Sequence, residues 1–513
     1  MNKTKHRSTE PRPSTQAGLV VACVVFSVSS ILWGVSLWLR MNFNINFQEI
    51  LYTMTSPLVG TDPGVVLKCL RFCLPHICLS ALYILTAVVI VMLQRRFTAT
   101  LSFQVRGRGR QVDLFRLARR AMAVVSILAL GWAFRSLYVH LKVGEYIQLR
   151  RNPTTIYEER YVDPATVSIT PPAQKKNLIY IYLESMETSY ASTEVGGHQP
   201  DHNYIPNLTA LALENLSFSN SEQLGGFHTS SGATWTMGSI FATTSGLPFS
   251  FPVGANAMNR HSEFASGCTT LGDILEENGY HNVFLCGSDA TFGGRRLYYQ
   301  QHGNYDIYDL FTAREEGYIP EDYKVWWGYE DEILYQIARD KLTALAQAGQ
   351  PFNFTMLTAD THHVDGYLCS LCRDDYDSIT GNVVSCADRQ IADFIQWCRG
   401  QDFYDNSIIV IIGDHPRMDN RLVDWLDYYD RTVYNCFLNC GTPTPGRAVN
   451  REFTAVDLFP TVMSALGFTF QGDQLGFGVD LFSGSDTLSE VMGFQALDEE
   501  FAKYSPFVEK HLS

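Results

Sequence analysis

Three long apolar runs lie near the start of the chain and constrain its fold more than any other feature. They cover residues 18–39, 73–93 and 121–139. A helix needs about 20 apolar residues to cross the hydrocarbon core of a bilayer, and each run has about that length. The sequence therefore predicts a transmembrane domain at residues 18–141 with three spanning helices.

Basic residues set the expected orientation of these helices. The leader at residues 1–17 and the connection between the second and third runs are rich in Lys and Arg, whereas residues 41–66 contain neither. Because Lys and Arg favour the cytoplasmic side, we expect a cytoplasmic N-terminus, with everything after the third run on the opposite side of the membrane. A cleaved signal peptide is disfavoured, because the first run exceeds a usual signal core and no small-residue cleavage site ends it.

The remainder of the chain has the pattern of a large globular domain. Residues 142–176 are polar and proline-containing, which predicts a stalk. In residues 177–513, strand-like runs alternate with helix-like segments. The strand-like runs are 178–183, 281–286, 353–358 and 408–412, and the helix-like segments are 205–214, 271–278, 332–348, 388–399 and 455–466. This alternation predicts an α/β domain with a mostly parallel sheet between helices.

The net charge disfavours one class of partner, and the cysteines indicate where disulfides could form. The formal net charge is −14, which argues against a nucleic-acid partner. The twelve cysteines permit disulfides in an oxidising compartment. Cys369, Cys372 and Cys386 are the best placed to form one, across an irregular polar loop. A four-cysteine zinc site is less favoured there, because no second tight cysteine pair follows.

Potential metal ligands follow three of the strand-like runs, among them His362 and His363 in TADTHH. Glu184 follows NLIYIYL, and Asp414 and His415 follow SIIVIIG. Open α/β sheets place their sites at the carboxyl ends of parallel strands, so these groups should meet. Carboxylate and imidazole are common metal ligands, and a buried carboxylate must be paired or ligated. The alternatives are an ion pair for Glu184 and a helix cap for Asp414.

A third strand-like run and a glycine-rich turn supply further candidates. Asp360, His362 and His363 lie in TADTHH, and an imidazole near neutral pH can hold a phosphate oxygen or protonate a leaving group. Arg295, in TFGGRR, offers a bidentate donor for a phosphoryl group. One histidine, and the arginine, can equally be structural.

A nucleophile is expected in HTSSGATWTMGSIFATTSGLP. A helix should start near Thr234 and end at Gly246, with Pro248 beyond it. A hydroxyl at the start of a helix gains from the helix dipole and from free backbone N–H groups when it accepts a phosphoryl group. The alternative is a Ser/Thr-rich helix cap without chemistry.

Together these segments resemble the phosphoglycerol transferase and lipoteichoic acid synthase branch of the alkaline phosphatase and sulfatase superfamily. The resemblance runs from about residue 177 to 468 and rests on NLIYIYLESMETSY, PNLTALA, WTMGSIFATTSGLP, LGDILEENGY, TADTHHVDGY, VSCADRQIADFI, IIGDHPRMDN and AVDLFPTVMSALGF. It implies a three-helix transmembrane bundle followed by an extracytoplasmic sulfatase-like domain.

The resemblance also implies a reaction. It implies one divalent ion, Mn²⁺ ahead of Mg²⁺, Ca²⁺ or Zn²⁺, held by Glu184, Asp414, His415 and a nucleophilic threonine. His362 and Arg295 would hold the substrate phosphate, and Trp235, Thr236 and Asp360 would lie beside them. Members of the family take phosphoglycerol from phosphatidylglycerol, form a glycerophospho-threonine, release diacylglycerol and pass the group to a glycan or teichoic-type acceptor.

One position departs from the family pattern. Counting back from Gly246, with Thr236 kept three residues after the nucleophile, puts Ala233 at the nucleophile position. Alanine cannot attack phosphorus. Thr234 then serves after a local shift, or the chain is an inactive glycan- or lipid-binding relative, or the alanine is a deliberate substitution.

Two other transfer chemistries compete with this hypothesis. A phosphoethanolamine transferase shares the topology and a similar site, so the donor headgroup stays open. A sulfatase is disfavoured, because the segment has no Cys or Ser followed by Pro and Arg at the required spacing.

Overall fold

The computed structural model describes residues 13–43, 47–55, 63–105, 108–251, 263–440, 442 and 445–512. The chain divides into two compact units: Met1–Phe47 with Pro63–Tyr146, and Gln48–Asp62 with Ile147–Ser513. The predicted transmembrane domain at 18–141 differs from the first unit, because the segment Gln48–Asp62 groups with the second. Most of the predicted leader, residues 1–12, lies outside the described residues.

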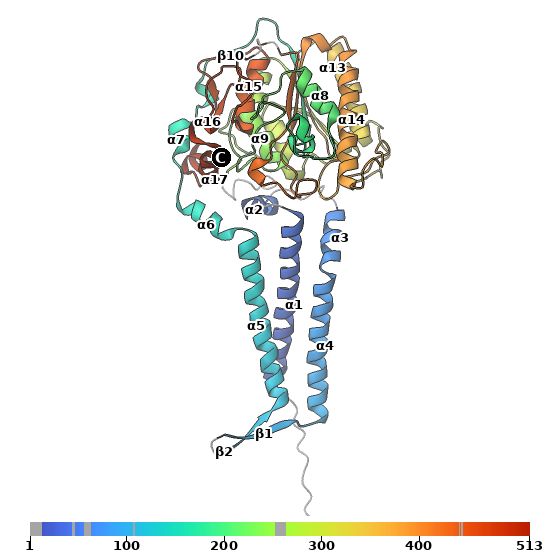
Figure 1. Ribbon diagram of the computed structural model, residues 1–513, viewed down its shortest axis with the longest axis vertical. Helices are drawn as coiled ribbons and strands as arrows, with labels where there is room; N and C mark the ends of the chain where they lie inside the picture. Colours follow the sequence, from blue (N-terminus) through green and yellow to red (C-terminus); the bar gives the residue numbers. More distant parts are fainter. Residues whose placement is uncertain are drawn as a thin grey trace, which may run out of the picture. The chain divides into compact units, whose positions relative to one another are not determined.

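The first unit consists mainly of three long helices (Figure 1). They are α1 (Pro13–Asn42), α4 (Leu74–Arg96) and α5 (Leu114–His140), accompanied by α3 (Pro63–Phe72) and the antiparallel hairpin β1 (Thr100–Val105) and β2 (Arg108–Asp113). Gln16–Asn42, Leu74–Arg96 and Leu114–His140 are long and apolar enough to cross a membrane. Serine hydroxyls bridge α1 and α5, at Ser36 to Ser136 over 2.9 Å and at Ser126 to the Ala22 carbonyl over 2.8 Å. Such small polar residues let apolar helices approach closely.

A six-stranded sheet forms the centre of the second unit. The strands are β4 (Asn177–Leu183), β5 (His281–Cys286), β6 (Asp306–Tyr308), β7 (Phe352–Leu357), β8 (Ser407–Gly413) and β9 (Asn435–Leu438). Their order is β6-β5-β7-β4-β8-β9, with β9 antiparallel and all other neighbours parallel. The predicted mostly parallel sheet is therefore confirmed. The sequence analysis missed the edge strands β6 and β9, which are only three and four residues long.

Helices cover both faces of this sheet, as predicted (Figure 1). In β4, Tyr180 and Tyr182 enter one buried cluster, whereas Ile179 and Ile181 enter the other, as expected when successive side chains of a strand point to opposite faces. The first cluster includes side chains of α9 (Thr236–Ser245), α10 (Leu271–Glu277), α11 (Arg295–Gln301) and α15 (Leu458–Ala465). The second includes those of α8 (Pro206–Glu214), α12 (Leu310–Glu315), α13 (Asp331–Ala348) and α14 (Ile379–Arg399).

Shorter elements complete the described chain. They are α2 (Phe47–Thr55), α6 (Val143–Arg151), α7 (Ile156–Arg160), α16 (Leu488–Met492), α17 (Phe494–Ala502) and the two-residue strands β3 (Ile169–Thr170), β10 (Thr469–Phe470), β11 (Gln474–Leu475) and β12 (Gly478–Val479). Short helical turns lie at Pro164–Thr166, Thr188–Tyr190, Thr193–Val195, Phe292–Gly294, Tyr404–Asn406, Tyr428–Asp430, Ala455–Asp457 and Val508–Leu512. Because β3 pairs with β10, the predicted stalk at 142–176 also contributes to the folded second unit.

Candidate active site

The carboxyl ends of the parallel strands bring the predicted ligands together. Glu184 follows β4, and Asp414 and His415 follow β8, its neighbour in the sheet. All three side chains are at least 98% buried, and their ligand atoms lie within 4.8 Å of one another. His415 Nε2 lies 3.4 Å from Asp414 Oδ2 and 3.8 Å from Glu184 Oε1. The strand-end argument therefore predicted this cluster correctly.

The hydrogen bonds of the cluster leave its ligand atoms facing one another. His415 Nδ1 donates to the Pro416 carbonyl over 2.9 Å; since a carbonyl can only accept, Nδ1 carries the proton and Nε2 presents a lone pair. Asp414 Oδ1 accepts from the backbone N–H of Ser185 over 2.7 Å, whereas Oδ2 has no hydrogen-bond partner among the described residues. Two unshared acceptors 3.4 Å apart in a buried site fit a cation between them.

The electrostatics of the cluster agree with this arrangement. Burial raises the pKa of Asp414 to about 7, and the charge of Glu184 adds to the effect. Burial also acts to raise the pKa of Glu184, but His362 and His415 outweigh it, so this pKa lies below its usual range. Burial acts to lower the pKa of His415, but Asp414 and Glu184 raise it. The site therefore concentrates negative charge that a divalent ion would neutralise.

In addition to the Ser185 hydroxyl, which donates to Glu184 Oε1 over 2.6 Å, Thr236 places a second hydroxyl beside this cluster. It is the first residue of α9, and its Oγ1 lies 3.3 Å from Glu184 Oε2 and 3.4 Å from His415 Nε2. The side chain is only partly buried, so a substrate can approach it. A hydroxyl at this point combines the start of a helix with the ligand cluster.

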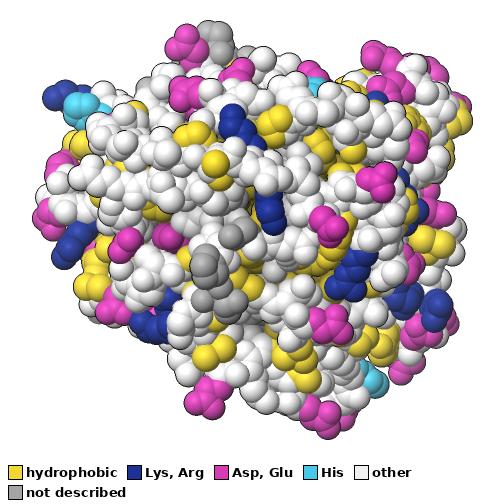
Figure 2. Space-filling model, turned by 90° about the horizontal axis from the view of Figure 1, so that it is seen from above, with side chains coloured by type: hydrophobic (Ala, Val, Ile, Leu, Met, Phe, Trp, Pro, Cys, Tyr) yellow, Lys and Arg dark blue, Asp and Glu magenta, His cyan; other side chains and the backbone are white. Residues whose placement is uncertain are grey.

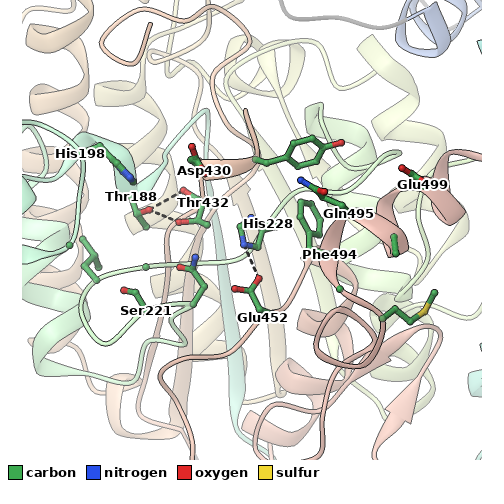
Figure 3. Close-up of a pocket in the computed structure, with 18 residues that line it drawn as sticks. Thr188, His198, Ser221, His228, Asp430, Thr432, Glu452, Phe494, Gln495 and Glu499 are labelled. Carbon is green, nitrogen blue, oxygen red and sulfur yellow. Dashed lines mark hydrogen bonds and ion pairs between the residues drawn. The ribbon is translucent and has the colours of Figure 1, made fainter. Parts of the chain in front are cut away.

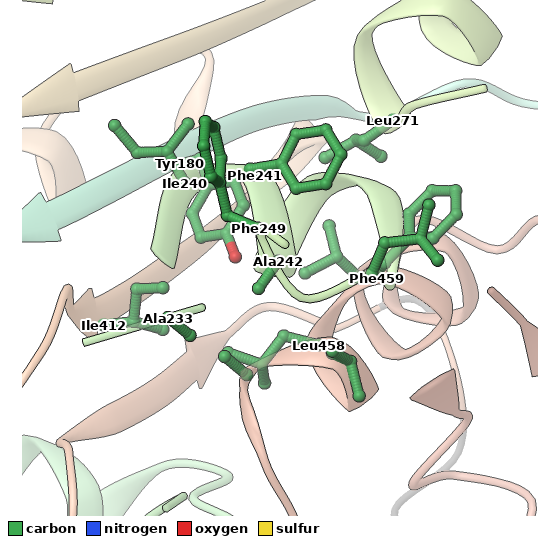
Figure 4. Close-up of a cluster of buried hydrophobic side chains, with 14 of the residues drawn as sticks. Tyr180, Ala233, Ile240, Phe241, Ala242, Phe249, Leu271, Ile412, Leu458 and Phe459 are labelled. Carbon is green, nitrogen blue, oxygen red and sulfur yellow. The ribbon is translucent and has the colours of Figure 1, made fainter. Parts of the chain in front are cut away.

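The register that placed the nucleophile position at Ala233 does not agree with the structure. Ala233 is fully buried in the apolar cluster that contains Ile412 and Leu458 (Figure 4). The helix begins at Thr236, two residues later than expected, so the hydroxyl that faces the cluster lies three residues beyond Ala233. The alternative, Thr234, donates its hydroxyl hydrogen bond to Glu49 instead.

Helix α2 brings two side chains to this region, and neither was predicted from the sequence. Glu49 is 5% exposed and accepts from Thr234, while the Tyr52 hydroxyl donates to the Gly293 carbonyl over 2.6 Å. The ring of Tyr52 lies 5.2 Å from that of Trp235, whose indole N–H has no partner among the described residues. The sequence of residues 47–55 gave no sign of these contacts.

The other predicted site residues lie around the same edge of the sheet. His362 Nδ1 donates to the His363 carbonyl over 2.6 Å, and the two rings stack at 4.1 Å. Burial lowers the pKa of His362, although the charge of Glu184 opposes the shift. Arg295 is 6% exposed and begins α11, where its Nη2 donates to Ser288 Oγ over 3.0 Å.

Asp360 has a different environment from the one predicted. Its Oδ2 accepts from the backbone N–H of Asp331, and the Asp331 carboxylate accepts from the backbone N–H of Asp360 over 3.1 Å. Asp360 thus joins the start of α13 to the loop after β7. Its described contacts are with this helix start, whereas the three-ligand cluster is built by other residues.

Buried ion pairs hold the loops behind the cluster. Glu187 and Arg431 are 0% and 2% exposed and pair at 2.6 Å. Arg417 is 1% exposed, pairs with Asp419 at 2.6 Å and donates to the Thr361 carbonyl beside His362. The motifs ESMETSY and GDHPRMDN contain Glu187, Arg417 and Asp419. Their ion pairs could not be predicted from the motifs, because they depend on contacts between distant segments.

A separate open pocket of about 930 Å³ lies in the second unit (Figure 3). Its lining includes His228, which pairs with Glu452 at 3.1 Å and stacks on Phe494 at 4.5 Å. None of the predicted site residues lines it, so it is distinct from the three-ligand cluster. On the face drawn in Figure 2, acidic side chains are scattered among fewer basic ones, and the coloured residues form no large basic patch.

Comparison with known proteins identifies the family. Residues 176–468 match the sulfatase family. The chain belongs to this family. Its sulfatase-family domain spans the sheet and every ligand described above, which confirms the family that the motifs indicated.

Two curated proteins with similar sequences carry the same name. Phosphoglycerol transferase I of Xanthomonas axonopodis pv. citri (strain 306) is 32% identical over 335 residues, covering 63% of this chain and 46% of that protein. Phosphoglycerol transferase I of Salmonella choleraesuis (strain SC-B67) is 33% identical over 340 residues, covering 64% and 42%. The chain therefore spans less than half the length of these curated relatives.

Among solved structures, the integral membrane protein lipooligosaccharide phosphoethanolamine transferase A (EptA) from Neisseria meningitidis is similar to this chain. It is 15% identical, with a TM-score of 0.48, and the match covers 88% of this chain and 84% of that one.

Proposed function

We propose that this protein transfers phosphoglycerol from phosphatidylglycerol to a hydroxyl of a glycan or teichoic-type acceptor outside a bacterial inner membrane, with Thr236 as the nucleophile. One observation carries the proposal: Thr236 Oγ1 lies 3.3–3.4 Å from two members of the buried Glu184, Asp414 and His415 cluster. The name of the 32% identical relatives supports phosphoglycerol as the transferred group, and three helices able to cross a membrane support access to a lipid donor.

The reaction proceeds in two displacements. In the first, Thr236 Oγ1 loses its proton and bonds to phosphorus, the bond from phosphorus to the diacylglycerol oxygen breaks, and that oxygen takes a proton as diacylglycerol leaves. In the second, an acceptor hydroxyl loses its proton and bonds to phosphorus, while the bond to Thr236 breaks and its oxygen is reprotonated. The phosphoryl group thus passes through a covalent glycerophospho-threonine.

Residues at the sheet edge assist these steps. Because Nδ1 of His362 donates to a carbonyl, its Nε2 is available to carry the proton between the attacking and leaving oxygens. The unpartnered indole N–H of Trp235 and the guanidinium of Arg295 supply donors for phosphate oxygens. The start of α9 adds backbone N–H groups beside the same phosphate.

Glu184, Asp414, His415 and Thr236 would hold one divalent ion, and we propose Mn²⁺. When bound, such an ion neutralises the buried carboxylates, lowers the pKa of the threonine hydroxyl and stabilises charge on phosphorus. The mixed carboxylate and imidazole donors also suit Mg²⁺, Ca²⁺ or Zn²⁺ to differing degrees. Chelation should abolish transfer, and adding back single ions should rank them.

The test uses the full chain in detergent with Mn²⁺ and headgroup-labelled phosphatidylglycerol, following covalent label and diacylglycerol. Thr236→Ala should lose at least ~1000-fold of both signals, as expected when a nucleophile is removed, and Thr236→Ser should restore part of them. Thr234→Ala is the matched control and should keep covalent labelling.

Three results would contradict the proposal. Label on Thr234 in peptide mapping would make that residue the nucleophile. A gain of activity only in Ala233→Thr would show that position 233, and not Thr236, is the nucleophile position. Transfer from phosphatidylethanolamine in place of phosphatidylglycerol would keep the chemistry and overturn the donor.

A further inference from the structure

Three cysteine sulfurs meet in the loop that follows the sheet edge. Cys369 and Cys372 lie in the irregular segment between β7 and α14, and Cys386 lies on α14. Cys369 Sγ is 3.7 Å from Cys372 Sγ and 3.7 Å from Cys386 Sγ, and all three sulfurs lie within 4.8 Å of one another. The disulfide expected for this loop is not formed, because bonded sulfurs lie about 2.05 Å apart.

These separations match a shared metal ion. Two thiolates bound tetrahedrally to zinc, each about 2.3 Å from it, lie about 3.8 Å from one another. The observed 3.7 Å agrees with that edge for both measured sulfur pairs. Three thiols without a common ion have no reason to converge in this way, since S–H groups form only weak hydrogen bonds.

A buried glutamine lies beside two of the three sulfurs. Gln390 is 6% exposed and lies one helical turn after Cys386. Its amide nitrogen Nε2 donates to Cys386 Sγ over 3.6 Å and to Cys369 Sγ over 3.8 Å, while its Oε1 has no hydrogen-bond partner among the described residues. Rotating the amide by 180° exchanges its oxygen and nitrogen and directs the oxygen at the sulfurs. The sulfur–oxygen edge of a tetrahedral zinc site is about 3.6 Å.

We propose that Cys369, Cys372, Cys386 and the amide oxygen of Gln390 bind a structural zinc ion. Thiolates favour zinc over the harder ions suited to the carboxylate cluster, so the two sites select different metals. Cys386 is buried, whereas Cys372 is partly exposed and gives an ion access.

The zinc ion would fix the loop that begins at the active site. This loop carries His362 near its start, where Arg417 holds the Thr361 carbonyl and the Tyr367 N–H donates to the Asp360 carbonyl over 2.7 Å. Linking Cys369 and Cys372 to α14 holds the far half of the loop. The site thereby stabilises the position of His362 without contacting substrate.

Metal content of the full chain purified in detergent tests this proposal. The Asp414→Asn background is used so that the carboxylate cluster does not add to the measurement. About one zinc per chain should remain, and Cys386→Ser should remove it. Cys398→Ser, a buried cysteine on the same helix, is the matched control and should leave zinc unchanged. Cobalt substitution should give the visible absorption of a tetrahedral thiolate, lost in Cys386→Ser.

Thiol counting keeps the test independent of whether Cys386→Ser folds. In the otherwise unaltered chain, Cys369, Cys372 and Cys386 should be protected from alkylation and become reactive when a chelator removes zinc, as peptide mapping would identify, whereas the other buried cysteines should not respond to the chelator. Gln390→Leu should weaken zinc binding at least ~10-fold, the usual effect of losing a supporting group. A disulfide between any two of the three cysteines, or zinc content unchanged by Cys386→Ser, would overturn the proposal. Failure of phosphoglycerol transfer would not affect it.

Discussion

At the scale of single residues, Glu49 is the most informative side chain outside the ligand cluster. It stands between the first two apolar runs in sequence, yet it is buried in the second unit and accepts from Thr234, two residues before the proposed nucleophile. Its charge acts to raise the pKa of His415, so it lies within electrostatic reach of the cluster. Glu49 is therefore a positioning residue for the segment that leads into α9.

Replacing Glu49 tests this role. Glu49→Ala removes the acceptor of the Thr234 hydroxyl, which should cost about 1–3 kcal/mol of α2 docking and speed hydrogen exchange in residues 47–55. Glu49→Gln keeps an acceptor oxygen and should lose less. Thr53→Ala, which removes only a hydroxyl bonded within α2 to the Glu49 carbonyl, is the control. Equal exchange in Glu49→Ala and Thr53→Ala would contradict the assignment.

At the scale of elements, the Glu187–Arg431 pair joins the turn after β4 to the segment before β9. Both side chains are almost fully buried, and Glu187 also accepts from the Arg417 backbone N–H over 3.2 Å. Burial acts to raise the pKa of Glu187, but Arg431 outweighs it and holds this pKa below its usual range. The pair therefore stabilises the fold above the ordinary pKa of a glutamate, and this contribution is lost as the pH falls through the lowered value.

Removing one partner of the Glu187–Arg431 pair should destabilise the protein more than replacing both. Arg431→Met leaves an uncompensated buried carboxylate, so we expect a loss of about 3–5 kcal/mol in unfolding free energy. The double variant Glu187→Gln with Arg431→Met should recover much of that loss. Asp486→Asn breaks an exposed pair with Arg447 and should cost at most ~1 kcal/mol. Denaturant titration in detergent measures all three, and additive losses in the double variant would contradict the coupling.

At the scale of the whole molecule, the sequence predicted the architecture better than the details of the site. The apolar runs predicted the three membrane-spanning helices, and the strand ends predicted that Glu184, Asp414 and His415 would meet. Both features could be predicted because they depend on local sequence pattern. The start of α9 was expected near Thr234 but lies at Thr236, because Trp235 precedes the helix with extended backbone. Glu49 and Gln390 could not be predicted, since their roles arise only from contacts between distant segments.

The stability of the whole protein should also depend on the buried pair of Asp331 and Asp360. Burial raises the pKa of Asp331 to about 7, and burial together with the charge of Asp331 raises the pKa of Asp360 well above its usual value. Raised carboxyl pKa values mean that the folded state keeps protons that the unfolded state releases. The stabilisation of the folded state by these retained protons is therefore complete below about pH 4 and is lost as the pH rises towards 7.

Asp360→Asn isolates this contribution. The asparagine keeps an acceptor for the Asp331 N–H but cannot ionise, so it removes the pH dependence that the raised pKa of Asp360 contributes. The variant should gain about 1–2 kcal/mol relative to the unaltered protein between pH 5 and pH 7.5, since one pKa unit corresponds to ~1.4 kcal/mol. Thermal melting at the two pH values measures the gap, with Asp377→Asn, an exposed acid in the same loop, as control. A gap that stays constant with pH would mean that the raised pKa of Asp360 does not contribute to stability, and that the loop after β7 is held to α13 by the backbone hydrogen bonds alone.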